Sequence, residues 1–124
     1  MDKNIDRIIK LYIHTVLSQQ PDILSAYLFG SYARNNQRPE SDIDIALVFN
    51  NLSDNDRFDT QVKLMLLAAN IDDRIEPHPI SQQELHSNNP FALEILKTGV
   101  KLNFKPENKK KINNLESSSK LLAG

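Results

Sequence analysis

The sequence predicts a single α/β (α+β) domain in which helices cover a small mixed β-sheet. Helical periodicity over residues 3–20 and 56–70, and apolar runs of strand length at 23–29 and 43–49, are the main observations behind this class. The two kinds of segment alternate along the chain, which is typical of a sheet with helices packed on it. A chain of 124 residues with 40% apolar content has room for one such domain with a modest core.

The first helix and the first strand are predicted from the spacing of apolar residues. Six of them recur on one face of residues 3–20, and Pro21 is expected to end that helix. They are Ile5, Ile8, Ile9, Tyr12, Val16 and Leu17. In the strand at 23–29, alternation predicts one face made by Leu24, Ala26 and Leu28 and the other made by Tyr27 and Phe29.

Gly30 and Ser31 interrupt the first apolar run. Residues 32–34 are expected to form a single helical turn, followed by a polar loop at 35–39 and a second strand that ends at Phe49. Because side chains alternate along a strand, Asp42 and Asp44 share one face. The opposite face is made by Ile43, Ile45, Leu47 and Phe49. The apolar face is expected to be core, so the acidic face needs another explanation.

A second long helix is predicted over residues 56–70, where the helical period returns after a turn at 50–55. The residues expected to face the core are Phe58, Val62, Met65, Leu66 and Ala69. The strand predicted next, at 71–80, contains Pro77 and Pro79. Because proline cannot donate to a β-ladder, this strand is expected at a sheet edge.

The remaining elements are predicted from capping signals. Residues 81–84 form a capping box, which marks the start of a helix. Asn89-Pro90 is expected to interrupt it and to restart a helix at 91–97, which stops at Gly99. With a short strand within 100–104, the folded domain is expected to span residues 1–104. Residues 105–124 are expected to form a basic, flexible C-terminal tail.

Asp42 and Asp44 are candidates for metal binding. Two carboxylates two positions apart on a strand lie roughly 6.5 to 7 Å apart along the backbone and can lean towards one point. At about 4 Å their repulsion is on the order of 4 kcal/mol at the effective dielectric of a protein surface. A divalent cation would compensate this repulsion, and aspartate oxygens with open positions suit Mg²⁺ shared with substrate phosphates.

Gly30 and Ser31 are candidates for phosphate binding. Glycine lets the backbone approach an anion closely, and Ser31 can cap the following helical turn while its hydroxyl and the first free amides face a phosphate. A phosphate cradle that faces a metal-binding carboxylate pair indicates nucleotidyl transfer.

Gly30-Ser31, followed after ten residues by Asp42-x-Asp44, resembles the signature of the polymerase-beta-type nucleotidyltransferase superfamily. More narrowly, the spacing is similar to that of the minimal nucleotidyltransferases, the MNT or MntA-type antitoxins of toxin-antitoxin pairs. The resemblance extends over about residues 1–104 and implies a polymerase-beta-like fold. The family usually has arginine at the position of Arg34, so the resemblance also implies that Arg34 contacts the nucleotide.

The resemblance implies a third carboxylate on the strand after the long helix, behind an apolar residue. Glu76 follows Ile75 and fits best, although the family more often has aspartate there, and Asp72 and Asp73 remain alternatives. His78 shares the face of Glu76 by alternation. It could line the acceptor side, although a plain edge histidine is the simpler interpretation.

The resemblance implies an Mg²⁺-dependent enzyme that transfers AMP from ATP to an acceptor hydroxyl and releases pyrophosphate. Asp42, Asp44 and Glu76 would be its metal-binding and catalytic residues, with two Mg²⁺ ions. Gly30, Ser31 and Arg34 would bind the nucleotide. The minimal group neutralises a HEPN-domain ribonuclease toxin by transferring AMP to a tyrosine of that toxin. The resemblance therefore implies an antitoxin with a HEPN partner.

Two other hypotheses stay open at this point. A small-molecule nucleotidyltransferase would gain its acceptor pocket by dimerising. A catalytically inactive partner-binding module would keep only the fold, although the retained Gly30, Ser31, Asp42 and Asp44 argue against decay of the site.

Composition and charge argue against several other classes of protein and site. The chain has no cysteine, which excludes disulfides and thiolate zinc sites. Its start carries no signal peptide and its longest apolar stretch is too short for a membrane span, so a cytoplasmic protein is expected. Residues 105–124 hold five lysines and two glutamates and carry +3, which leaves −4 on residues 1–104 out of a total of −1. Such an acidic body argues against direct nucleic-acid binding.

Overall fold

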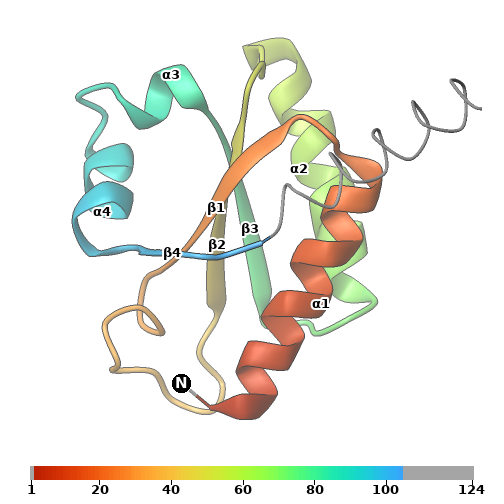
Figure 1. Ribbon diagram of the computed structural model, residues 1–124, viewed down its shortest axis with the longest axis vertical. Coiled ribbons are helices and arrows are strands. Elements are labelled where there is room, and N and C mark those ends of the chain that lie inside the picture. The colour runs from red at the N-terminus through yellow and green to blue at the C-terminus, as the bar shows by residue number, and fades with distance from the viewer. Residues whose placement is uncertain (1, 105–124) are drawn as a thin grey trace, which may run out of the picture.

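The computed structural model describes residues 2–104, which form a four-stranded sheet between two helical layers (Figure 1). In chain order the elements are α1 (Lys3–Gln19), β1 (Ile23–Phe29), β2 (Ile43–Phe49), α2 (Asp54–Ala69), β3 (Ile75–Ser81), α3 (Gln82–Leu85), α4 (Pro90–Thr98) and β4 (Val100–Lys101). The predicted fold class and order of elements are thus confirmed. The predicted tail at 105–124 lies outside the described residues. Among the described helices, none is both long enough and apolar enough to cross a membrane.

The sheet has the strand order β3-β2-β1-β4. β1 is antiparallel to β2 and to β4, whereas β2 and β3 are parallel. In this register Phe29, the last residue of β1, lies opposite Asp44, and Asp44 lies opposite Glu76 on β3. The end of β1 and the beginnings of β2 and β3 therefore meet at one end of the sheet.

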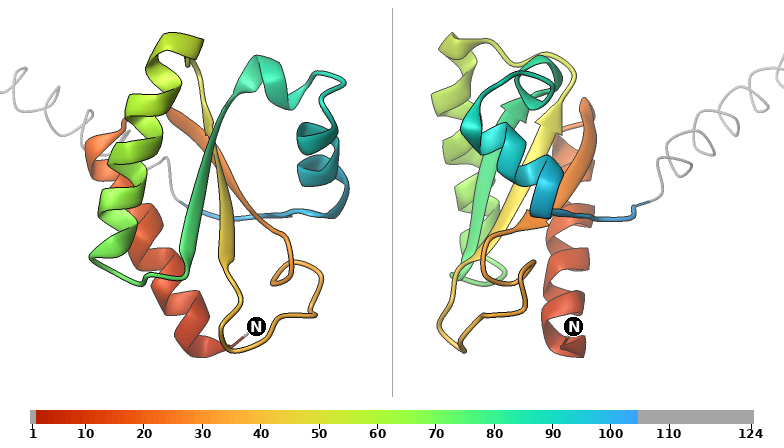
Figure 2. Two further views of the ribbon diagram at one scale, coloured as in Figure 1. Left: turned by 180° about the vertical axis from the view of Figure 1, so that it is seen from behind. Right: turned by 90° about the vertical axis from the view of Figure 1, so that its left-hand side faces the viewer.

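The two faces of the sheet carry separate cores. Helices α1 and α2 lie on one side of the sheet, and α3 and α4 lie on the other (Figure 2). The apolar face of β2 packs into the first core, as predicted, through Ile43, Ile45, Leu47 and Phe49. On the other face of β2, Ala46 and Val48 follow the acidic residues and pack into the second core, so the acids occupy only the first part of that face.

The predicted alternation of β1 does not hold at its start. Leu24 was expected to share one face with Ala26 and Leu28, but those two residues are buried and the exposed fraction of Leu24 is 44%. The pairing of β1 with β2 shifts register between Ile23 and Ser25, which is the signature of a β-bulge. The prediction was wrong at Leu24 because the bulge breaks the strict alternation on which it depended.

The inward face of α2 was also predicted wrongly. Its buried residues are Leu64 and Ala68. The predicted stripe is exposed, at 74% for Phe58, 38% for Val62, 51% for Met65 and 64% for Leu66, and Ala69 is exposed as well. The helix carries apolar residues on more than one face, so periodicity alone selected the wrong one.

Polar side chains of α2 explain its orientation. Gln61 donates to the Pro77 carbonyl at 2.7 Å and Arg57 donates to the Pro79 carbonyl at 3.2 Å. Both carbonyls belong to the edge strand β3, which confirms the predicted edge position. These contacts turn the face with Arg57, Gln61 and the buried Leu64 towards the sheet, although most of the large apolar residues of α2 lie on another face.

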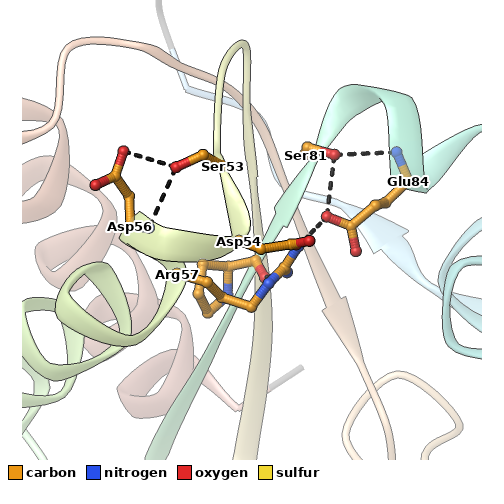
Figure 3. Close-up of polar contacts among 7 residues, drawn as sticks. Ser53, Asp54, Asp56, Arg57, Ser81 and Glu84 are labelled. Carbon is orange, nitrogen blue, oxygen red and sulfur yellow. Dashed lines mark hydrogen bonds and ion pairs between the residues drawn. The ribbon is translucent and has the colours of Figure 1, made fainter.

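Arg57 also links the beginnings of α2 and α3 (Figure 3). It forms ion pairs with Glu84 and, at 3.5 Å, with Asp54. The Ser81 hydroxyl accepts from the Glu84 amide at 3.1 Å and donates to its carboxylate, so the predicted capping box is confirmed. Asn89 caps α4 by accepting from the Phe91 amide at 2.8 Å, and Pro90 is the first residue of that helix. This network holds α3 against the end of β3 that is remote from Asp44.

Candidate active site

The two predicted aspartates lie where β2 begins. Asp44 is the second residue of the strand and is partly buried, whereas Asp42 immediately precedes the strand and is exposed. The acidic side of β2 is the side that α3 and α4 cover further along, because Ala46 and Val48 share it. The pair thus stands at the open end of a covered sheet face.

The Asp44 carboxylate lies close to Gly30 and to His78. Gly30 has φ of +74°, a left-handed conformation that glycine adopts readily. A Cβ atom at this position would lie 2.4 Å from Asp44 Oδ2, so a larger residue would displace the carboxylate. His78 Nε2 lies 3.2 Å from the other oxygen, Asp44 Oδ1. Gly30 is therefore required by both its backbone conformation and its contact with Asp44.

Glu76 is brought beside both aspartates. It lies opposite Asp44 in the parallel register, and its pKa is raised, first by a hydrogen bond shared with Asp42, then by burial and by the negative charges of Asp42 and Asp44. The two alternatives are placed differently. Asp73 is exposed and precedes the strand. Asp72 is engaged by the Arg74 guanidinium at 2.9 and 2.8 Å, which holds its pKa below the ordinary value.

The site concentrates negative charge. Burial is the main cause of the raised pKa of Asp44, and Asp42 and Glu94 add to it, whereas the hydrogen bond and charge of His78 oppose it. Ionised carboxylates so placed repel one another, and a cation between them would remove that cost.

The donor atoms fit a divalent cation. One ligand atom each from Asp44, Glu76 and His78 lies within 4.8 Å of the other two, and Asp42 adjoins Glu76. Carboxylate oxygens at the mouth of a site suit Mg²⁺, which retains waters and shares substrate phosphates.

The turn after β1 lies at the same end of the sheet. The amide of Arg34 donates to the Gly30 carbonyl at 3.2 Å, and that of Asn36 donates to the Ser31 carbonyl at 3.1 Å. The predicted helical turn therefore exists as one hydrogen-bonded turn that does not continue as a helix. Within residues 2–104 the Ser31 hydroxyl engages no other group. The Arg34 guanidinium pairs with Glu94 of α4 at 3.3 Å, and both side chains are nearly half exposed.

The family described as "Polymerase beta, Nucleotidyltransferase" matches residues 12–118. The chain belongs to this family. The match covers most of the sequence, including the Gly30-Ser31 turn and all three carboxylates. It confirms the polymerase-beta-like fold and the resemblance drawn from the motif.

Solved structures support the same fold. A candidate nucleotidyltransferase from Sulfolobus solfataricus is 24% identical, with a TM-score of 0.58 over 80% of this chain and 79% of the other. A toxin-antitoxin structure with AMP-PNP is 20% identical, with a TM-score of 0.54 over 92% and 90%. A complex of tri-AMPylated Shewanella oneidensis HEPN toxin with MNT antitoxin is 17% identical, with a TM-score of 0.53 over 95% and 89%. A search of curated proteins finds no match.

Two residues at the candidate site of this nucleotidyltransferase were not among the predicted site residues. His78 was identifiable only as a residue on the face of Glu76, and its contact with Asp44 follows from the parallel register of β2 and β3. Glu94 carried no signal in the sequence, because it reaches the site through the packing of α4 against β1.

In the metal-free nucleotidyltransferase, Asp44→Asn is expected to raise the free energy of unfolding at pH 7 and to have little effect near pH 3. The folded-state pKa of Asp44 is raised, so the native state holds this proton more tightly than the unfolded chain, and ionisation costs stability as pH rises through that pKa. Asparagine removes this cost. Chemical denaturation at several pH values, with EDTA present, measures the difference.

Asp72→Asn is the matched control and should have the opposite sign. The pKa of Asp72 is lowered by Arg74, so its charge stabilises the fold at neutral pH and this contribution is lost as pH falls through the folded-state pKa. A destabilisation by Asp44→Asn that is equal at every pH would contradict the assigned electrostatic cost.

Proposed function

We propose that this protein transfers AMP from ATP to a hydroxyl group of a partner protein, with Mg²⁺ as cofactor. The observation that carries the proposal is the convergence of Asp42, Asp44 and Glu76 beside the Gly30-Ser31 turn. The acceptor we propose is a tyrosine of a HEPN-type toxin, which makes the protein an antitoxin.

Each residue has a role that its position supports. Asp42, Asp44 and Glu76 hold Mg²⁺, with two ions expected. The ions would neutralise the triphosphate and lower the pKa of the acceptor hydroxyl. The Gly30-Ser31 turn would present amide groups to the phosphates, together with the Ser31 hydroxyl, which engages no other group within residues 2–104. Arg34 would exchange its exposed contact with Glu94 for the charge of the triphosphate.

The reaction is an in-line displacement. The acceptor oxygen forms a bond to the α-phosphorus of ATP, the bond from that phosphorus to the bridging oxygen breaks, and pyrophosphate leaves. The hydroxyl proton passes to a carboxylate at the mouth of the site. Glu76 suits this role because its side chain is exposed at the mouth of the site, opposite Asp44 in the sheet register.

Three observations support a protein acceptor. The 103 described residues form the sheet, its helices and the phosphate turn, so a small-molecule acceptor would lack the enclosing pocket that such ligands normally need. The acidic charge of residues 1–104 disfavours a nucleic-acid acceptor. The toxin-antitoxin complexes with the same fold include one with an AMPylated HEPN toxin.

The proposed transfer predicts a mass gain of one or more AMP units on a cognate HEPN partner incubated with this protein, ATP and Mg²⁺. Intact-mass analysis of each purified chain measures it, and a variant of the partner with phenylalanine at the modified tyrosine is the control. An unmodified partner alongside modification of an aminoglycoside or a nucleotide would favour the small-molecule enzyme. Stable binding with no transfer to any acceptor would favour an inactive binding module.

A further inference from the structure

We infer that His78 is a positioning residue that holds the Asp44 carboxylate in the orientation needed to bind the divalent cation. The inference rests on the proposed function, because it concerns the cation site at Asp44. It adds to that site a side chain from β3 that is neither a carboxylate nor part of the phosphate turn.

The first step is the contact itself. His78 Nε2 lies 3.2 Å from Asp44 Oδ1, and His78 lies two residues after Glu76 on the same face of β3. An ionised carboxylate can only accept a hydrogen bond, so Nε2 carries the proton that it donates. Gly30 leaves the space that Oδ2 occupies, since a Cβ atom there would lie 2.4 Å from it. The hydrogen bond to Oδ1 therefore restricts rotation of the carboxylate before any cation arrives.

The second step is the fixation of the imidazole ring. The ring of Phe29 lies 5.0 Å from that of His78 at 66°, and the ring of Phe91 lies 5.6 Å away at 46°. The two phenylalanines contact each other at 5.2 Å, edge to face. These rings come from β1, β3 and α4, and Phe29 is buried in the second core. Such aromatic contacts hold His78 in one rotamer, so its hydrogen bond is directed at Asp44 without loss of side-chain freedom on binding.

The third step is the expected energetic consequence. Some side chains do not touch the metal but form a hydrogen bond to one of its ligands. Removing such a side chain typically weakens metal binding about 10–100-fold. His78→Leu keeps an apolar side chain against Phe29 and Phe91 but removes the donor. His78→Gln keeps an N–H donor at about the distance of Nε2 and is the matched control.

The test is binding of Mn²⁺ alone, as a spectroscopic substitute for Mg²⁺, to the full chain without nucleotide or partner. Electron paramagnetic resonance titration should show roughly 10–100-fold weaker binding for His78→Leu and a change of less than about threefold for His78→Gln. Should the leucine variant fail to fold, His78→Asn provides a second comparison, because its shorter amide cannot reach Asp44 and should bind as weakly as expected for leucine.

The possible results separate this inference from the proposed function. Equal affinity of wild type, leucine and glutamine variants would overturn the inference while the cation site stands. Nitrogen hyperfine coupling to bound Mn²⁺ that disappears on substitution of His78 would also overturn it, because the imidazole would then be a direct ligand. A wild-type chain that binds no Mn²⁺ would overturn both the inference and the cation site. Weak binding by leucine with recovery by glutamine supports it.

Discussion

Replacing Asp42 and Asp44 together with asparagine is expected to abolish AMP transfer, with a loss of at least about 1,000-fold in rate. Both carboxylates stand where β2 begins: Asp42 is exposed, and Asp44 is partly buried and hydrogen-bonded to His78. Without their charges the cation has no strong ligands, and the triphosphate is not neutralised in the transition state. Single-turnover kinetics with saturating ATP and Mg²⁺ measure the loss.

The double variant should still fold and still bind its partner. The pKa of Asp44 is raised, and the negative charges of Asp42 and Glu94 contribute to this shift. Neutral asparagine at this position therefore removes an unfavourable charge. In thermal denaturation Mg²⁺ and ATP should stabilise the wild type but leave the variant unchanged. Equal stabilisation of both proteins by Mg²⁺ would show that the ion binds elsewhere.

Glu76→Gln is expected to reduce transfer by about 100- to 1,000-fold, consistent with loss of a proton acceptor and metal ligand. The reason is its position opposite Asp44 and its hydrogen bond with Asp42. Binding of ATP should weaken far less than transfer slows, because the phosphate turn and the aspartate pair remain. Comparison of the transfer rate with ATP affinity from calorimetry separates the two effects.

Asp73→Asn is the matched control, since Asp73 is exposed and precedes β3. It should transfer AMP at close to the wild-type rate. Asp72→Asn should lower stability, through loss of the contacts with Arg74, more than it lowers activity. Full activity of Glu76→Gln combined with inactivity of Asp73→Asn would place the third carboxylate outside the strand.

Much of the fold was predictable from local signals. Residues 23–29 and 43–49 appear as strands because long apolar runs are bounded by a Gly-Ser turn and by polar loops. The capping residues Ser81 and Asn89 mark α3 and α4 because their side chains satisfy free amides at helix starts. These signals depend only on neighbours in sequence, so no knowledge of the tertiary packing was needed.

The errors arose where tertiary contacts determine which residues are buried. The face of α2 is set by Arg57 and Gln61, which reach the carbonyls of β3, and a pattern of apolar residues cannot reveal such contacts. Leu24 is exposed because a bulge interrupts the alternation.

The candidate site was predictable in proportion to how local its motifs are. The placement of Gly30, Ser31, Asp42 and Asp44 follows from one strand–turn–strand unit. The proximity of Glu76 to Asp44 requires the parallel register of β3. The resemblance indicated a third carboxylate on this strand, but neither it nor periodicity predicted the register. The contact of His78 with Asp44 and the charge of Glu94 near the site depend on side-chain packing between elements, so neither could be predicted from the sequence.

The prolines of β3 limit how another protein can attach to this domain. At Pro77 and Pro79 the outward side of the strand has no amide hydrogens, and both carbonyls already accept from Gln61 and Arg57. An incoming extended peptide would therefore find neither donors nor free acceptors at these positions and could not lengthen the sheet there. The opposite edge, β4, is only two residues long. Recognition of a partner at the β3 edge must therefore use side chains and not strand pairing, and this edge resists the edge-to-edge self-association that exposed strands promote.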